Sequence, residues 1–536
     1  MGGEMFKPKI FTVMKDYSKA QFMADAMAGA IVTVLAVPLS IAFAVSMGVP
    51  PEMGLYVSII ASFIVAILGG TYVQVGGPSV VFIVVVTGIM HQYGIEGVMI
   101  STFLAGLILL LLGILRLGTM IKYLPYPITI GFMSGTAVVV FTTQVQGFLG
   151  LQLEDVPANF IGRWTTYLSS LNQSDLLTVF VGMLALAILI FWPKVTKKIP
   201  SALVALVATT LVVRVLGLPV RTIGSQFTDL ALSLPRIELP RLSLETILYF
   251  FPTGLTIAFL CIVMSLLTAV AADNLTGKKH CSNTELIAQG VVNVILGMWG
   301  MIPAAGVATR TMANVENGAR TPIATLTHSI LLLTGLVFLL PLIRLIPMVT
   351  LAAMLIMAAY GMSEWRVFLR LLKAPKGDLL VLLATFLITI AFELSIAVVI
   401  GILLSAIVFM KRMSEQMHVD DNCPLAKQLP KAVSVFDVSG PLFFGDTDRF
   451  FDAIALHDDL KVVIIRLRVG MIDTTAMHTL SLLHDKCKSH QIRLILSETL
   501  DGPYHILKKI GMIKQLGKEN IFRDFEDAVR AATENL

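Results

Sequence analysis

Apolar segments of membrane-spanning length follow one another from the N-terminus to Arg412. A transmembrane helix needs about 20 predominantly apolar residues, and about fourteen segments meet or approach that length. With 56% hydrophobic and 14% charged residues, a soluble chain of this length could not bury its apolar surface. We therefore predict an α-helical polytopic membrane protein that contacts the lipid bilayer. The segments begin near Ala24, Met53, Pro78, Gly97, Pro127, Asp175, Ser201, Ile247, Glu285, Gly306, Pro322, Pro347, Gly377 and Leu394.

The distribution of Lys and Arg predicts how these segments are oriented. If the N-terminus is cytoplasmic and the segments alternate, basic residues gather at the inner ends, whereas the outer stretch 151–174 is poorer in Lys. This agrees with the positive-inside rule and predicts that both termini are cytoplasmic. We expect the membrane to be the inner membrane of a bacterium. The formal net charge of +5 then reports membrane topology and does not indicate nucleic-acid binding.

The composition changes after Arg412. A polar linker, 413–431, leads into a segment in which predicted strands alternate with predicted helices. The strands are "AVSVFDVSG", "KVVIIRLR" and "IRLILSE", and a helix "FRDFEDAVRAAT" closes the chain. Such alternation predicts a mostly parallel sheet with helices packed against it. We therefore predict a cytoplasmic N-terminus (1–23), a transmembrane domain (24–412), the linker and a cytoplasmic α/β domain (432–536).

Two apolar segments are interrupted by helix-breaking residues. "VQVGGPSVVFIVVV" (73–86) carries Gly-Gly-Pro near its start, and "GMIPAAGVATRTMANV" (300–315) carries Pro303 and Gly306. Proline is tolerated in the first turn of a helix, so the first segment predicts a helix that starts at Pro78 inside the membrane. Non-helical backbone at membrane depth must be buried in protein or line a cavity. Paired interruptions in the two halves of a membrane domain are typical of transporter sites built on inverted repeats.

The chemistry of these breaks favours an anion. A helix N-terminus presents unpaired N–H groups and a partial positive charge, and small side chains let an anion approach the backbone. Arg310 lies one helical turn after Gly306 and adds a full charge, which is a functional feature at membrane depth. The alternative is that Arg310 marks the cytoplasmic end of a short helix. The small residues of the predicted site are Gly77, Ser79, Ala305, Gly306 and Ala308.

These residues resemble the sulfate permease (SulP) family of anion transporters, to which prestin belongs. The similar stretches are "DAMAGAIVTVLAVPLSIAFA" (25–44), "GGPSVV" (76–81) and 271–322, and "VVIIRLRVGMIDTTAMHTL" resembles the STAS domain of the family. The resemblance implies a UraA-like fold of seven plus seven inverted spans, with a moving core domain and a gate domain that forms a homodimer. By position it also implies that backbone amides of Ser79, Val80, Gly306, Val307 and Ala308 line the anion site, and that Phe43 closes it.

The chain departs from the family pattern at the position that couples transport to cations. Many bacterial members carry an acidic residue in the eighth span, four residues before a Ser or Thr; here Met264 takes the acidic position and Thr268 is kept. Leu39 replaces a Gln that commonly follows the proline of the first span. A thioether can neither carry a proton nor pair with sodium. We therefore predict exchange or uncoupled movement of anions.

Other polar residues are assigned structural roles. Asp273 is predicted to cap or pair locally at the end of the eighth span, and Glu393 to lie in a tight turn. In the tail, Thr474 takes the position that is phosphorylated in stand-alone STAS proteins, although a structural or docking role is expected here. The four cysteines show no spacing typical of a metal site, so neither a metal nor a cofactor is predicted.

The sequence thus predicts a secondary active transporter or exchanger of small inorganic anions that works by alternating access. Sulfate, bicarbonate, chloride and a dicarboxylate remain open as substrates, because helix dipoles recognise charge. The alternatives are an uncoupled, channel-like carrier and a membrane-anchored sensor that signals through the STAS domain. A nucleobase carrier would need acidic residues in the eighth and tenth spans, which are missing. No catalytic motif indicates an enzyme.

Overall fold

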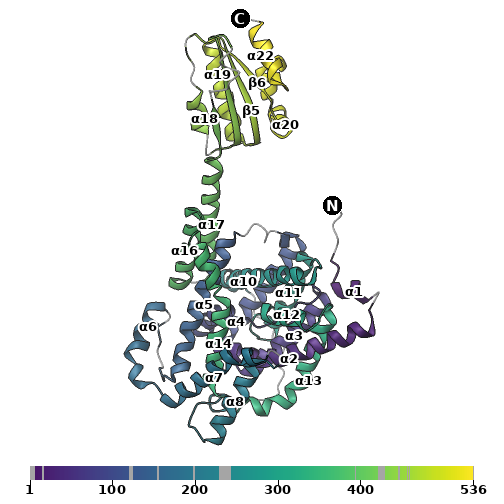
Figure 1. Cartoon of the computed structure of the whole chain (residues 1–536), viewed down its shortest axis with the longest axis vertical. Helices are drawn as coiled ribbons and strands as arrows, with labels where there is room; N and C mark the ends of the chain where they lie inside the picture. Colours follow the sequence, from purple (N-terminus) through teal and green to yellow (C-terminus); the bar gives the residue numbers. More distant parts are fainter. Residues whose placement is uncertain are drawn as a thin grey trace. The chain divides into compact units, whose positions relative to one another are not determined.

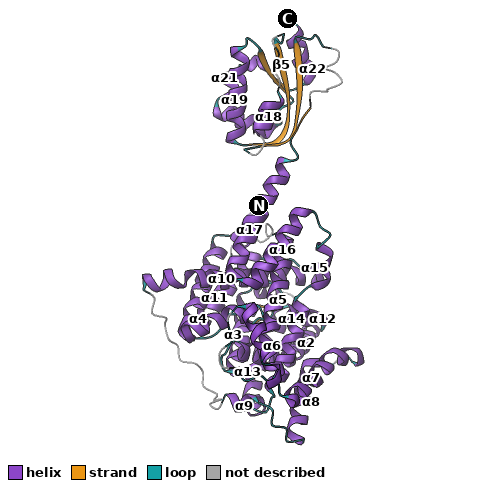
Figure 2. Cartoon of the chain, turned by 90° about the vertical axis from the view of Figure 1, so that its left-hand side faces the viewer, coloured by secondary structure: helices purple, strands orange, loops and turns teal. Residues whose placement is uncertain are grey.

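The computed structural model describes residues 6–536 except 15–16, 120–124, 154–155, 158, 197–198, 228–242, 393, 421–428, 445–446, 455–456, 458 and 535–536. It divides into two compact units, Met1–Ile402 and Leu403–Leu536, drawn in Figure 1. The division falls within α17 (Leu394–Ser414). The first unit is helical, and the second contains a five-stranded sheet. Figure 2 draws the helices in purple and the strands in orange.

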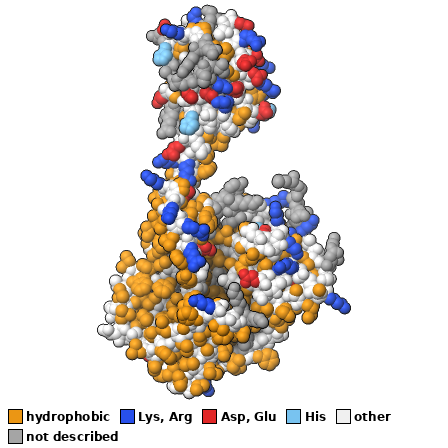
Figure 3. Space-filling view, viewed as in Figure 1, with side chains coloured by type: hydrophobic (Ala, Val, Ile, Leu, Met, Phe, Trp, Pro, Cys, Tyr) orange, Lys and Arg blue, Asp and Glu red, His pale blue; other side chains and the backbone are white. Residues whose placement is uncertain are grey.

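Helices account for all the predicted membrane segments. One helix, α4, holds both the third and the fourth segments. Its regular backbone is interrupted between them at Gly94 (φ 63°). Seven of the described helices are long and apolar enough to cross a membrane, and Figure 3 shows hydrophobic side chains over the surface of this unit. The helices before α17 are α1 (Lys9–Val13), α2 (Lys19–Ser46), α3 (Pro51–Leu68), α4 (Phe82–Ile114), α5 (Tyr126–Leu149), α6 (Phe160–Ser169), α7 (Leu176–Val195), α8 (Ser201–Val215), α9 (Ile223–Gln226), α10 (Leu244–Thr276), α11 (Ser282–Met298), α12 (Ala308–Glu316), α13 (Pro322–Ile343), α14 (Met348–Met362), α15 (Trp365–Leu371) and α16 (Lys376–Ala391).

Prolines define where many of these helices begin. Pro51 and Pro322 stand in the first turns of α3 and α13, and Pro347 precedes α14 directly. The missing N–H of proline is not needed at a helix start, and its fixed φ suits the first turn. The starts predicted at Pro127, Ser201, Pro322 and Pro347 are therefore confirmed to within one residue.

The helices of the first unit pack in two groups. The first four predicted spans (α2, α3 and both parts of α4) pack with the eighth to eleventh (α10 to α13). The fifth and sixth (α5, α7) pack with the twelfth (α14), and α5 also packs with the thirteenth (α16). Both interruptions in the sequence fall within the first group. The predicted seven-plus-seven inverted repeat remains a prediction.

The second unit is a sheet covered by helices on both faces. Its strand order is β3-β4-β5-β6-β7, with β3 antiparallel to β4 and the other pairs parallel. The predicted strands correspond to β4, β5 and β6, and the predicted final helix to α22. The elements are β3 (His418–Asp420), β4 (Val433–Leu442), α18 (Thr447–Ala453), β5 (Val462–Ile472), α19 (Thr474–Ser489), β6 (Arg493–Ser497), α20 (Asp501–Ile510), α21 (Met512–Leu516), β7 (Ile521–Phe522) and α22 (Phe525–Thr533).

The alternation of side chains along the strands divides the core of this unit into two layers. On β5, Val463 and Ile465 join a cluster with α18 to α21, while Val462 and Ile464 join a separate cluster with α22. Successive residues of a strand point to opposite faces of a sheet, so a continuous apolar run indicates burial on both faces. The mostly parallel α/β unit predicted from the sequence is therefore confirmed.

Candidate functional site

The two interruptions meet in the structure and pair with each other. β1 (Gly76–Gly77) runs antiparallel to β2 (Ala305–Gly306), with Gly76 opposite Gly306 and Gly77 opposite Ala305. The pair connects segments more than 200 residues apart in sequence. We call this pairing, with the first turns of α4 and α12, the crossing. The sequence predicted two broken helices, and the structure brings them into direct contact.

Hydrogen bonds from neighbouring helices satisfy the backbone around the crossing. The N–H of Val307 donates to the carbonyl of Val75 (2.9 Å), and that of Gly306 donates to the Ser265 hydroxyl (2.9 Å). In turn, the N–H of Val75 donates to the Thr311 hydroxyl (3.0 Å). Such pairing is what permits extended backbone inside a membrane protein. The crossing is consequently a fixed element of the fold.

The two helices start at different distances from their breaks. α12 begins at Ala308, directly after Val307, as predicted. The prediction that the other helix starts at Pro78 is wrong, because α4 begins at Phe82. A tight turn precedes it, in which the N–H of Phe82 donates to the carbonyl of Ser79 (3.1 Å). The N–H of Ile83 is paired in the same turn, with the carbonyl of Val80 (3.2 Å). The first-turn N–H groups of α12, by contrast, have no acceptor within their own helix.

Arg310 is the buried cation of the crossing. Its side chain is 1% exposed and donates to the hydroxyls of Ser58 (3.0 Å) and Ser40 (2.9 Å), on α3 and α2. The guanidinium lies so close to Gly77 that a Cβ there would be 2.5 Å from its Nη1. Within the described part of the chain, no carboxylate forms an ion pair with Arg310. A buried charge without a counter-charge is costly, so the site is suited to an anion from solution.

The other predicted site residues are buried around the crossing. Phe43, Val80 and Met264 belong to one apolar cluster that joins α2, α4 and α10. Ser79 is 3% and Val307 is 5% exposed, whereas Ala308 is half-buried. Thr268 is 2% exposed, and its hydroxyl has no hydrogen-bond partner. Thr474 lies apart in the second unit, where it is exposed as the first residue of α19.

Sequence reasoning missed several polar groups at the crossing. Ser40 and Ser58, which hold Arg310, are themselves 2.7 Å apart through their hydroxyl oxygens. Gln74 is 1% exposed, and neither polar atom of its side-chain amide has a partner. Gln74 is a polar residue within an apolar run, which was the available signal. Hydroxyl groups in apolar helices are too common to have distinguished Ser40 and Ser58.

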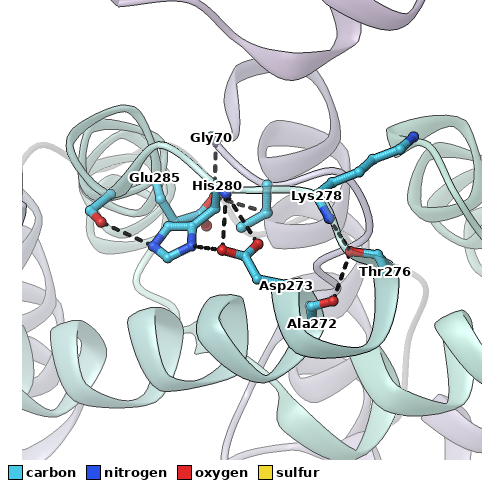
Figure 4. A network of polar contacts seen from close by, with 9 residues as sticks. Gly70, Ala272, Asp273, Thr276, Lys278, His280 and Glu285 are labelled. Atoms are coloured by element: carbon cyan, nitrogen blue, oxygen red, sulfur yellow. Dashed lines mark hydrogen bonds and ion pairs between the residues drawn. The ribbon is translucent and has the colours of Figure 1, made fainter.

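Asp273 pairs locally, as predicted, at the end of α10. Its carboxylate accepts from the ring Nδ1 of His280 (2.7 Å) and from the N–H of the same residue (3.1 Å), as Figure 4 shows. The neighbouring Glu285, which was not singled out from the sequence, accepts from the N–H of Gly70 and from the Thr71 hydroxyl (both 3.0 Å). These contacts fix the segment that leads into β1. Glu393 lies outside the described residues.

Comparison with known proteins connects this arrangement to transport. The Sulfate permease family matches residues 22–385, and the STAS domain matches residues 424–528. A candidate sulfate transporter of Bacillus subtilis, YvdB, is 36% identical over 523 residues, which cover 96% of this chain and 98% of that protein. The bicarbonate transporter BicA of Picosynechococcus sp. is 28% identical over 456 residues and 78% of both chains.

Solved structures show the same fold. The transmembrane domain of a cyanobacterial BicA superposes with a TM-score of 0.64 at 25% identity, covering 73% of this chain and 98% of that one. The structure of SLC26A9 superposes with a TM-score of 0.87 at 18% identity, covering 97% and 92%. Fold, crossing and relatives together define an integral membrane anion transporter with a STAS domain. The chain belongs to the sulfate permease family.

Proposed function

We propose that this protein is a secondary transporter or exchanger of small inorganic anions, and that the anion binds at the crossing. The observation that carries the proposal is Arg310, which is buried beside two helix starts and has no carboxylate partner among the described residues. The start of α12 directs unpaired N–H groups at this region, and both helix starts direct a partial positive charge there. The lining proposed here is Phe43, Gly77, Ser79, Val80, Gly306, Val307, Ala308 and Arg310.

Arg310 acts on the anion through its charge, and two serine hydroxyls fix the position of its guanidinium. Two of its nitrogens donate to Ser40 and Ser58, so the guanidinium is held in place before an anion arrives. Its Nε has no partner. A positive charge fixed in a low-dielectric interior attracts an anion without reorganisation of the site.

The two helix groups provide the parts for alternating access. All the residues of the crossing lie on the first group (α2 to α4 with α10 to α13), whereas the second group is built around α5, α7 and α14. We propose that the first group carries the anion as a core domain and that the second forms a gate and a homodimer. Movement of one packed group against another around a fixed site is the general behaviour of repeat-based transporters.

Liposome transport separates this function from its alternatives. We expect purified protein to move labelled sulfate, bicarbonate or chloride across the bilayer, with saturation and with acceleration by an anion on the opposite side. A sensor that signals through the STAS domain would bind an anion without moving it. A channel-like carrier would show flux that does not respond to the opposite side. Either result would contradict the proposal of exchange.

Met264 leads to a prediction about coupling. We expect transport by the unmodified protein not to be driven by an imposed proton or sodium gradient at this position, since a thioether has no protonated and deprotonated states near neutral pH. Met264→Glu should introduce pH dependence, because a carboxylate charged at high pH competes with the anion and its protonation relieves that competition. Uptake should therefore rise as pH falls. Met264→Gln, which cannot ionise, is the control, and its uptake should not depend on pH. Strong gradient-driven accumulation by the unmodified protein would show that coupling lies elsewhere.

The separate core of the second unit leads to another prediction. We expect a chain that ends at Arg412 to bind anions with unchanged affinity, but to lose regulation, dimer stability or expression. The proposed site residues lie in the first unit, and the sheet has its own apolar clusters. Anion titration of truncated and full-length protein checks this. A purified truncated chain that binds none of the anions bound by the full chain would show that the units depend on each other.

The remaining sequence-based assignments are part of the same proposal. Both termini face the cytoplasm of a bacterium, and Thr474 has a structural or docking role in the STAS domain. The linker 413–431 joins the two domains and contributes β3 to the sheet. The residue before Thr474, Asp473, holds the start of α19 in place. Its carboxylate accepts from the N–H of Ala476 (2.8 Å) and from that of Phe444 (3.0 Å). These bonds fix the start of α19 and leave Thr474 exposed.

A further inference from the structure

Gln74 is a buried amide that lacks the partners such a group requires. Its side chain is 1% exposed, and neither Oε1 nor Nε2 forms a hydrogen bond with any residue that the structure describes. Its backbone carbonyl, by contrast, accepts from the Thr325 hydroxyl (2.9 Å), so the residue is held in place. Buried polar atoms are almost always paired, and an unpaired one lowers stability. The amide of Gln74 is therefore available to pair with a ligand or a water.

The amide lies at the crossing, on the side of β2 that faces α10. A Cβ built on Gly306 would collide with Nε2 of Gln74 and would lie 3.1 Å from the Cα of Ser265. Glycine at position 306 is thus what leaves room for the amide. Thr268 follows Ser265 by three residues and shares its helix face, and its hydroxyl is also buried and unpaired. In the described part of the chain, unpaired polar groups accordingly occur both just before β1 and on α10.

The amide differs chemically from the rest of the proposed site. Backbone N–H groups and Arg310 offer only hydrogen-bond donors to a ligand, and Ser79 offers a single hydroxyl, whereas Gln74 offers two N–H donors and one carbonyl acceptor in one group. A halide, sulfate or nitrate can use donors only and leaves Oε1 unpaired. An oxyanion that retains an O–H group can accept from Nε2 and donate to Oε1.

We propose that Gln74 is a specificity-determining residue that selects a singly charged oxyanion bearing an O–H group, such as hydrogencarbonate. This inference rests on the proposed function and names the class of anion for its site. Discrimination arises because a site with a buried acceptor rejects an analogue that cannot satisfy it.

Hydrogencarbonate and nitrate form a matched pair of probes. Both are planar, trigonal and singly charged, and only hydrogencarbonate carries an O–H group. In liposomes containing the full chain, at mildly alkaline pH, we expect hydrogencarbonate to reach half-saturation at about ten-fold lower concentration than nitrate, as one net hydrogen bond allows. Gln74→Met should abolish this preference, with the value for nitrate changed by no more than about two-fold.

Two further variants make the test specific. Gln74→Asn withdraws the amide by one methylene group and should lose most of the preference. Gln144→Met is the control, because Gln144 is a buried glutamine of α5 whose amide donates to the Thr143 hydroxyl (2.9 Å). It should keep the wild-type ratio.

The outcomes separate this proposal from the proposed function. Nitrate transport with no preference for hydrogencarbonate in the wild type overturns the role of Gln74 and leaves the anion transporter standing. If a folded Gln74→Met protein keeps the wild-type ratio of half-saturation concentrations for nitrate and hydrogencarbonate, the role of Gln74 is overturned as well. The amide is then assigned to a bound water. If neither variant of Gln74 folds, the wild-type ratio alone decides. Failure of the wild type to move any anion overturns both proposals.

Discussion

Arg310→Met is expected to raise the dissociation constant for the transported anion by about a hundred-fold while the protein stays folded. A full charge about 5 Å from an anion, at an effective dielectric constant near 20, contributes about 3 kcal/mol. Methionine fills much of the volume of the arginine, and it removes a buried charge that has no carboxylate partner among the residues the structure describes. Anion titration by calorimetry, on protein that elutes as a single species, measures the change.

Arg320→Met is the matched control for this substitution. Arg320 follows α12, and its guanidinium donates to the carbonyls of Val315 (3.0 Å) and Ala319 (2.7 Å), away from the crossing. We expect its affinity for anions to match that of the wild type. Equal affinities for Arg310→Met and wild type in folded protein would show that Arg310 only fills space between α2, α3 and α12.

Gly290→Leu is expected to prevent the first unit from folding. Gly290 on α11 packs directly against α4: a Cβ there would be 2.7 Å from the backbone N of Leu110 and 2.9 Å from the carbonyl oxygen of Gly106. Because these are backbone atoms, the two helices would have to separate. Overpacking of a tight core lowers the free energy of unfolding by about 1–3 kcal/mol even where side chains can adjust. The loss of stability in Gly290→Leu should therefore exceed about 3 kcal/mol. Small residues allow this close approach of membrane helices.

Gly88→Leu provides the comparison on the same helix pair. A Cβ at Gly88 of α4 would meet no heavy atom within 4 Å. We expect this variant to be purified with the yield and elution profile of the wild type, and Gly290→Leu to aggregate. Monodisperse Gly290→Leu protein with an unchanged melting temperature would mean that α4 and α11 are not in the contact described above.

Much of the fold could be predicted from the sequence because a bilayer restricts the possible structures. Backbone groups in lipid must be satisfied within a segment, so apolar runs of sufficient length indicate helices. Prolines then located several starts, as at Pro322 and Pro347. The start of α4 was placed four residues early, because a tight turn at Ser79 follows Pro78 before the regular helix. This turn follows β1, and its conformation depends on the pairing of β1 with β2.

The candidate site could be located from the sequence, but its contacts could not. Gly-Pro breaks within apolar segments indicated where backbone leaves the helix, which is a local property. That Gly76 lies opposite Gly306, or that Arg310 donates to Ser40 and Ser58, depends on contacts between residues more than 200 positions apart. In the tail, β3 and β7 were missed because they are only three and two residues long and form by pairing with longer neighbours.

The location of the bound anion tests the central claim most directly. An experimental structure of the full chain with an electron-rich anion, such as bromide or selenate, shows where the anion sits. We expect its strongest anomalous peak between the first turns of α4 and α12, within reach of the Arg310 guanidinium, and we expect that peak to be lost in Arg310→Met. A fully occupied anion elsewhere in the helical unit, with an empty crossing, would contradict the account.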